Sequence, residues 1–327
     1  MDENLAVIEM LKDKRSQLLK EIHKVIIGQD KVIDDIVIGL FSNGHMLIEG
    51  VPGLAKTLLI STIAQAFNLS FSRIQFTPDL MPSDITGSEI LNQSEQRQTN
   101  YYDFIKGPVF ANIILADEIN RTPPKTQAAL LQAMQENQVT YGNRTWNLDL
   151  PFIVLATQNP IEQEGTYPLP EAQLDRFMFY INIGYPSLEE EKLIVAQTSG
   201  LNESKVNQVM NAADLILAQK SIRSIPVSEH VINFAVDLVR STRPFEKNAS
   251  DYIQKWVNWG AGPRASQFLI MAAKSRAALM GRLTPSEDDV VGVAEIVLQH
   301  RILVSFAAEA EGIRSVDIVK HLLNKKT

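Results

Sequence analysis

The sequence predicts an α/β domain built on a five-stranded, mostly parallel sheet, followed by an all-helical C-terminal domain. Short apolar runs alternate with helical stretches from about residue 43 to residue 186, and only helical spacing continues beyond Pro186-Ser187. At 327 residues the chain is also too long for one comfortable hydrophobic core. We therefore expect domains at 1–186 and 187–327.

The first domain begins with helices and continues with strands. Residues 1–24 and 31–40 carry apolar side chains at helical spacing. The turn pair Asn43-Gly44 then introduces the apolar runs, which are separated by helical stretches, as in a parallel sheet. The expected strands span residues 45–49, 70–76, 111–118, 152–159 and 177–183.

Two segments interrupt this alternation. Residues 78–107 are punctuated by Pro and Gly and contain a polar tract at 92–100, which predicts an insertion or long loop. Residues 138–150 predict a hairpin, because two short β-type runs flank Gly142-Asn143. Both segments are expected to lie outside the sheet.

The second domain is expected to contain helices at 188–198, 206–218, 228–240, 266–280 and 285–304. Trp256 and Trp259 precede the fourth of these helices. We expect both indole rings to pack within this domain rather than to bind a ligand.

Composition excludes several classes of protein. Apolar residues make up 45% and charged residues 21%, as in ordinary globular domains, and no apolar run is long enough for a membrane span. The chain has no Cys, which excludes disulfides and thiolate metal sites. The acidic start Met1-Asp2-Glu3 resembles neither a secretory signal nor a transit peptide, so we expect a cytoplasmic protein.

The net charge of −7 is unevenly distributed. Residues 1–186 carry 14 basic and 22 acidic side chains, and residues 187–327 carry 17 and 16. Neither half forms a basic surface, so the charge argues against nucleic acid as the main partner.

The strongest motif directly follows the first expected strand and precedes a helix. It comprises Gly50, Val51, Pro52, Gly53, Leu54, Ala55, Lys56 and Thr57, followed by Leu58. Small residues let backbone N–H groups surround a phosphate chain, with Lys56 reaching its β- and γ-phosphates and Thr57 coordinating Mg²⁺. Ala55 stands where the common pattern has Gly, and we expect it to be tolerated only if its φ is negative.

A second motif supports the first. The apolar run at 113–116 ends in Asp117 and Glu118. Successive side chains leave a strand in different directions, so Asp117 can hold the Mg²⁺ shell while Glu118 polarises the water that attacks the γ-phosphate. Jointly the two motifs predict a site for a nucleoside triphosphate and Mg²⁺.

Three further polar residues lie at the expected ends of elements. Asn159 closes the fourth strand and could orient the same water. Arg176 precedes the last strand, and Arg264 begins a helix of the second domain. Arginine suits the charge on phosphate oxygens, but spacing alone does not distinguish these residues from surface or ion-paired ones.

With these motifs the chain closely resembles the MoxR family of AAA+ ATPases. The resemblance is dense over residues 24–186 and looser beyond them. It runs through Ile27-Gly28-Gln29, the loop at 50–57, Phe76-Thr77-Pro78-Asp79, the segments at 107–111, 115–125 and 156–177, Gly262-Pro263-Arg264, and the segment at 299–302. Ala55 is itself typical of that family.

The resemblance implies a P-loop AAA+ core followed by an all-helical lid domain. Lys56 and Thr57 would be Walker A residues, Asp117 and Glu118 Walker B residues, and Asn159 sensor 1. The stretch around Ile26–Gln29 would touch the adenine of ATP. Arg176 would act as an arginine finger on a neighbouring subunit's ATP, although a nearby basic residue could serve instead, and Arg264 would be sensor 2. Segments 88–103 and 138–150 would be the helix-2 insert and the pre-sensor-1 hairpin, facing the ring's centre.

Three functions are compatible with these features. The first is an ATP-driven, chaperone-like remodeller. By the resemblance it would assemble into a ring of six subunits and act on partner proteins, some with von Willebrand A domains. The second is a nucleic-acid motor, which would need cations at the hairpin tip, where only Arg144 is basic. The third is a nucleotide-dependent scaffold without turnover, although all the residue types for hydrolysis are present.

Overall fold

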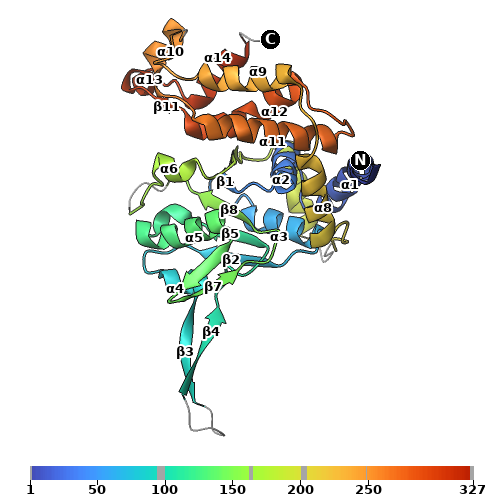
Figure 1. Cartoon of the computed structure of the whole chain (residues 1–327), viewed down its shortest axis with the longest axis vertical. Helices are drawn as coiled ribbons and strands as arrows, with labels where there is room; N and C mark the ends of the chain where they lie inside the picture. The colour runs from blue at the N-terminus through green and yellow to red at the C-terminus, as the bar shows by residue number, and fades with distance from the viewer. Residues whose placement is uncertain (1, 94–99, 162–164, 200–204, 248, 325–327) are drawn as a thin grey trace.

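A five-stranded sheet organises the N-terminal part of the chain (Figure 1). The computed structural model describes residues 2–93, 100–161, 165–199, 205–247 and 249–324. The strands stand in the order β2-β5-β8-β1-β9, and every neighbouring pair is parallel. They are β1 (Met46–Glu49), β2 (Phe71–Gln75), β5 (Ile113–Asp117), β8 (Ile153–Gln158) and β9 (Phe179–Asn182). The five predicted strands are confirmed, in a sheet that is wholly parallel.

Alternating side chains of the strands enter two hydrophobic clusters, one on each face of the sheet. On β5, Ile113 and Leu115 belong to one cluster, while Ile114 and Ala116 belong to the other. Helix α3 (Lys56–Ala66) contributes to the first cluster and helix α5 (Pro124–Glu136) to the second. Burial on both faces explains why the strands are nearly continuous apolar runs.

The N-terminal helices connect the sheet to the C-terminal part. They are α1 (Asp2–Ile22) and α2 (Asp30–Phe41), and both pack against α8 (Ala212–Arg223) and α11 (Pro263–Leu279). Helix α1 also packs against α3, and the three helices α1, α2 and α8 lie side by side in Figure 1. The chain's first forty residues therefore contact both parts of the molecule.

Two antiparallel hairpins lie outside the five-stranded sheet. Strands β3 (Gly87–Gln93) and β4 (Asn100–Lys106) follow the short helix α4 (Pro82–Thr86) and point away from the C-terminal helices (Figure 1). Of the two predicted alternatives, an insertion or a long loop, the structure therefore shows an insertion that forms a hairpin, and residues 94–99 of the predicted polar tract lie outside the described residues. The predicted hairpin at 138–150 is confirmed by β6 (Gln138–Tyr141) and β7 (Arg144–Asn147).

The C-terminal part is helical apart from one small sheet. Strands β10 (Val257–Trp259) and β11 (Leu303–Val304) pair antiparallel, so the expectation of an all-helical domain is wrong at this point. The sequence did not reveal these strands because they are two and three residues long. The helices are α7 (Leu188–Thr198), α9 (Glu229–Arg240), α10 (Asp251–Trp256), α12 (Glu287–Leu298), α13 (Phe306–Ala310) and α14 (Ser315–Asn324), with α8 and α11 above.

Short elements complete the chain: the 3₁₀ turns η1 (Ile119–Arg121) and η2 (Gln299–Arg301), and helix α6 (Glu171–Leu174). Within the part of the chain that the structure describes, no helix is both long and apolar enough to cross a membrane.

A buried carboxyl on α2 gives the fold a pH-dependent stability. Asp35 is 7% exposed, and burial raises its pKa to about 7. The charge of Lys31 opposes this rise, while Asp34 and Glu295 add to it. Because the folded pKa lies above the unfolded value, the folded chain binds the proton more tightly, and stability falls as pH rises from about 4 to about 7.

We expect Asp35→Asn to raise the free energy of unfolding by about 2–4 kcal/mol at pH 8 and to have little effect near pH 4. Thermal unfolding across this pH range measures the difference. Asp13→Asn is the matched control, because Asp13 is exposed on α1 and is not among the groups that shift the pKa of Asp35. If Asp35→Asn raised the free energy of unfolding equally at every pH, the raised pKa of Asp35 would not be the cause.

Candidate functional site

The candidate site lies where the carboxyl ends of several parallel strands meet. Strand β1 ends at Glu49, the 50–57 loop follows, and α3 begins at Lys56. This loop forms one wall of a pocket of about 440 Å³. The pocket is lined by Pro52, Gly53, Leu54, Ala55, Lys56, Thr57, Leu58, Arg73, Gln75, Asp117, Glu118 and Asn159.

Lys56 turns back over its own loop. Its Nζ donates hydrogen bonds to the carbonyl oxygens of Gly50 and, at 3.3 Å, of Val51. Partial burial lowers the pKa of Lys56, while the nearby carboxylates of Asp117 and Glu118 act in the opposite direction. The loop therefore places a cation opposite two acidic side chains.

Left-handed backbone conformations mark this site. Ala55 has φ +54°, so the expectation of a negative φ is wrong. Among the described residues, six non-glycine residues have positive φ: three are Asn43, Asn68 and Asn137, and the others are Gln29, Ala55 and Glu118. Asn adopts this conformation readily, whereas other residues incur about 1–2 kcal/mol. Such strain is concentrated at functional sites, and here all three costly positions are predicted site residues.

Asp117 and Glu118 are held by their neighbours at the end of β5. The Thr157 hydroxyl donates to Asp117 Oδ1 at 2.6 Å and accepts the Glu118 backbone N–H at 2.9 Å. Glu118 Oε2 accepts hydrogen bonds from Gln75 Nε2 at 2.9 Å and Arg121 Nη1 at 3.0 Å. The Thr157 hydroxyl thus fixes the position of the Asp117 carboxylate and of the Glu118 backbone at the end of β5.

Arg73 and Gln75 also line the pocket, although the sequence pattern did not predict them as site residues. Arg73 pairs with Asp117 Oδ2 through Nη2 at 2.6 Å and Nε at 3.1 Å, and also bonds Gln75 Oε1 at 2.7 Å. Both residues lie on β2, which is hydrogen-bonded to β5 in the sheet. Their polar alternation within an apolar run was a signal, but linking it to Asp117 required knowledge of strand order.

Asn159 completes the pocket. It directly follows β8, is largely buried, and accepts the backbone N–H of Ile161 through Oδ1 at 3.2 Å. The structure therefore brings Lys56, Thr57, Asp117, Glu118 and Asn159 to one pocket, as the sequence predicted.

Five other predicted residues do not line this pocket: Gly50 and Val51, at the start of the loop, and Gln29, Arg176 and Arg264. Gln29 is the N-cap residue directly before α2, and its buried Oε1 has no hydrogen-bond partner among the described residues. Arg176 is half-buried and donates through Nη1 to Leu131 O at 3.0 Å. Arg264, at the start of α11, pairs through Nη1 with Asp175 Oδ2 at 3.1 Å.

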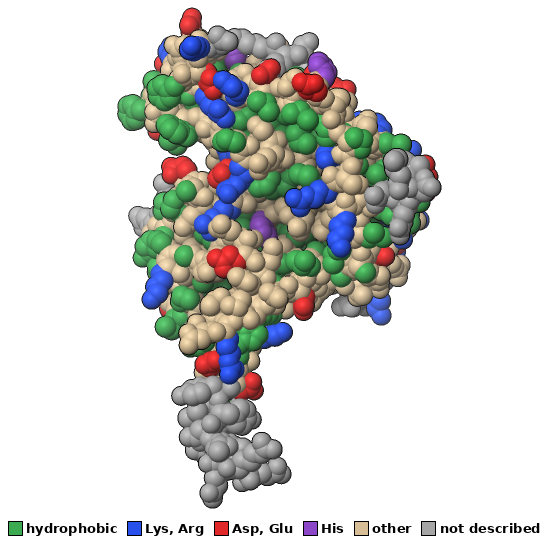
Figure 2. All heavy atoms as spheres, viewed as in Figure 1, with side chains coloured by type: hydrophobic (Ala, Val, Ile, Leu, Met, Phe, Trp, Pro, Cys, Tyr) green, Lys and Arg blue, Asp and Glu red, His purple; other side chains and the backbone are tan. Residues whose placement is uncertain are grey.

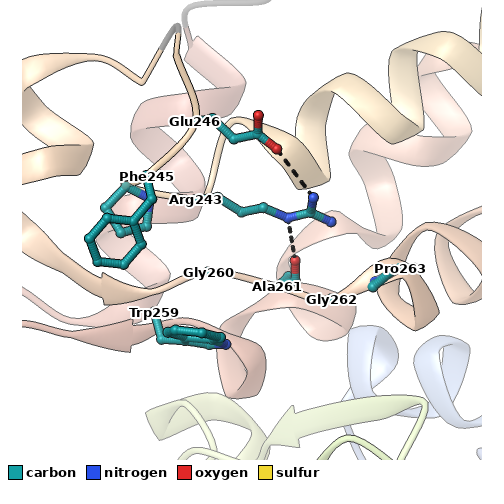
Figure 3. Close-up of a pocket in the computed structure, with 9 residues that line it drawn as sticks. Arg243, Phe245, Glu246, Trp259, Gly260, Ala261, Gly262 and Pro263 are labelled. Carbon is teal, nitrogen blue, oxygen red and sulfur yellow. Dashed lines mark hydrogen bonds and ion pairs between the residues drawn. The ribbon is translucent and has the colours of Figure 1, made fainter.

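A second hollow lies on the C-terminal part, against the loop that leads into α11 (Figure 3). Phe245 and Trp259 line it with ring centroids 6.5 Å apart, and Arg243 bonds Ala261 O at 3.0 Å and Glu246 at 3.3 Å. Trp259 is 67% exposed, so the expectation that it packs within the domain is wrong. Figure 2 shows hydrophobic side chains gathered at the upper left, in the region of α10 and α13.

Comparisons with known proteins agree with this architecture. Residues 45–179 match the family described as ATPase family associated with various cellular activities (AAA), and residues 252–322 match an AAA lid domain. The crystal structure of a proposed ATPase from Cytophaga hutchinsonii matches with a TM-score of 0.90 and 42% identity, covering 99% of this chain and 96% of that chain. The boundary near residue 186 falls between the two matched segments and stays a prediction.

Named relatives are similar over most of the chain. Chaperone MoxR1 of Mycobacterium tuberculosis is 44% identical over 93% of this chain and 79% of its own length. The protein YeaC of Bacillus subtilis is 38% identical over 98% of this chain and 96% of its own length.

The fold and the pocket define a P-loop AAA+ protein, with an α/β sheet domain and a helical lid. The chain belongs to the MoxR family of AAA+ ATPases.

Proposed function

We propose that this chain binds and hydrolyses Mg-ATP and uses the reaction, within a ring, to remodel partner proteins. The observation that carries the proposal is the convergence of Lys56, Asp117, Glu118 and Asn159 on one pocket. A cation for phosphates, two acids and an orienting amide are the groups that phosphoryl transfer to water requires.

The residues present fit an adenine nucleotide. A Cβ at Gly53 would meet nothing within 4 Å, so the mouth of the loop is open to a phosphate chain. The orphaned Gln29 Oε1 can accept a hydrogen bond, such as that of an adenine amino group. We propose that Lys56 leaves its loop carbonyls for phosphate oxygens and that Gln29 contacts the base.

Magnesium also fits, provided that it arrives with the nucleotide. The described residues contain no cluster of three or more His, Cys, Asp or Glu side chains that could hold a metal. Mg²⁺ needs only one or two protein oxygens when phosphates and waters supply the rest, and Thr57 and Asp117 would be these ligands. When bound, the ion would neutralise charge on the β- and γ-phosphates.

Glu118 is the proposed general base. Its carboxylate is held by Gln75 and Arg121 within the pocket, where it can polarise the attacking water while Asn159 orients it. Arg176 lies outside this pocket, which supports a role on the ATP of a neighbouring subunit, and Arg264 would contact the γ-phosphate from the lid.

The remodelling role is carried over from the family. A relative is named Chaperone MoxR1, and we propose chaperone-like maturation of partner proteins, including von Willebrand A domains, by a hexameric ring. The hairpin β6–β7 has Arg144 as the one basic side chain between residues 138 and 150, and no observation here favours a nucleic-acid motor.

The direct test is ATP binding by calorimetry and ATPase rate per subunit over a range of protein concentrations, with Mg²⁺ present. We expect binding at all concentrations and a rate per subunit that rises as rings assemble, followed by light scattering. A folded chain without affinity for adenine nucleotides would refute the proposal. A rate per subunit that does not depend on protein concentration would refute the proposal that Arg176 acts on the ATP of a neighbouring subunit.

A further inference from the structure

The lid is fastened to the edge of the sheet by the turn η2. Gln299 Nε2 donates to the carbonyl oxygen of Tyr180, and Asn182 Nδ2 donates to Gln299 Oε1 at 2.9 Å. Both partners belong to β9, the strand at the sheet's edge. The next residues of η2 extend this attachment to the segment just before β9.

Arg301 holds the backbone on both sides of Arg176. Its Nη2 donates to Asp175 O at 3.1 Å and Phe177 O at 2.7 Å, and its Nη1 donates to Met178 O at 3.3 Å. The Arg301 side chain is only 2% exposed. Burial lowers its pKa to about 10, against the charge of Asp175, so the guanidinium stays charged at neutral pH. The segment that carries Arg176 is thus fixed to the lid.

Asp175 joins this segment to a second lid arginine. Its Oδ1 accepts from Arg301 Nε at 2.8 Å, and its Oδ2 accepts from Arg264 Nη1 at 3.1 Å. Arg264 is 47% exposed, in contrast to Arg301. An ion pair with so exposed a partner is worth at most about 1 kcal/mol, so the contact with Arg264 is the one that can be exchanged.

We propose that Asp175 is a positioning residue that holds Arg264 away from the nucleotide and links its release to the segment carrying Arg176. This inference rests on the proposed roles of Arg264 and Arg176. A γ-phosphate carries more negative charge than one carboxylate and competes for the same guanidinium. When Arg264 moves to ATP, Asp175 keeps its contact with Arg301 but loses its ion pair with Arg264. The side chain next to Arg176, the residue proposed to act on the neighbouring subunit, is then held by one partner instead of two.

Asp175→Asn tests the competition with ATP. The variant is expected to fold, because Arg301 keeps its backbone carbonyl acceptors and the Asn oxygen. In a Glu118→Gln background, at protein concentrations below assembly, we expect Mg-ATP to bind about two- to fivefold more tightly and ADP to bind as before. A purely structural lesion would weaken both nucleotides.

Two variants serve as controls. The gain in ATP affinity should vanish in Asp175→Asn/Arg264→Ala. Asp34→Asn, which breaks the ion pair between Arg15 of α1 and Asp34 of α2, should leave the ratio of ATP to ADP affinity unchanged. ATP binding that is not tightened by Asp175→Asn, or a gain that persists without Arg264, would overturn the inference.

A second measurement needs neither ATP nor a change at Asp175. In nucleotide-free Arg264→Ala, hydrogen exchange at the amides of residues 175–178 should be faster than in the unaltered chain, because one restraint on Asp175 is lost. Unchanged exchange there would refute the link. Absence of ATP binding by the unaltered chain would instead refute the proposed function, so the two failures can be distinguished.

Discussion

Replacing Glu118 by glutamine is expected to lower the rate of ATP hydrolysis about 10²- to 10⁴-fold while ATP binding is retained. Glutamine keeps the shape of the side chain and one oxygen that can accept from Gln75 and Arg121, so the strained turn after β5 should be preserved. It lacks the negative charge that polarises the attacking water. The loss should therefore fall on turnover and not on affinity.

The measurement is kcat for phosphate release alongside Kd for Mg-ATP. Glu136→Gln is the matched control, because Glu136 is an exposed carboxylate at the end of α5 whose hydrogen-bond partners among the described residues are the side chains of Gln132 and Gln138. Normal turnover in Glu118→Gln would remove Glu118 from its role. Loss of binding together with turnover would show that the substitution disturbs the pocket rather than the chemistry.

Replacing Arg176 by alanine is expected to lower the ATPase rate by about 10³- to 10⁵-fold, the effect of removing an arginine that stabilises charge on the transferred phosphate. ATP affinity at low protein concentration should change little, because Arg176 does not line the chain's own pocket. Arg144→Ala, which removes an exposed arginine from the β6–β7 hairpin, is the control and should retain activity.

A mixing experiment separates a trans role from a cis role. Rings of Arg176→Ala alone or Glu118→Gln alone should be inactive. Mixed rings should recover activity, because a Glu118→Gln subunit supplies Arg176 to a neighbour whose Glu118 is intact. No recovery in rings shown to contain both variants would contradict action between subunits.

The sequence predicted the sheet and the centre of the site because both depend on local patterns. Strands buried on two faces are continuous apolar runs, and the residues at their carboxyl ends converge in any parallel sheet. Lys56, Asp117 and Asn159 could therefore be assigned to one site before strand order was known.

Other features depend on contacts between distant segments. Arg73 reaches Asp117 only because β2 lies beside β5. The left-handed conformation of Ala55 is imposed by its surroundings against the preference of an alanine side chain. The pair of Arg264 with Asp175 spans 89 residues and two parts of the molecule, so no local pattern announces it.

The attachment of η2 to β9 also links the position of the lid to the loop around Lys56 within one subunit. Strand β9 is hydrogen-bonded to β1, and β1 leads directly into the loop around Lys56. The strand pair β1–β9 therefore joins the lid's anchor on β9 to the strand that precedes the 50–57 loop. In the proposed reaction, a displacement of the lid at η2 would therefore reach the loop around Lys56 through this one pair of strands.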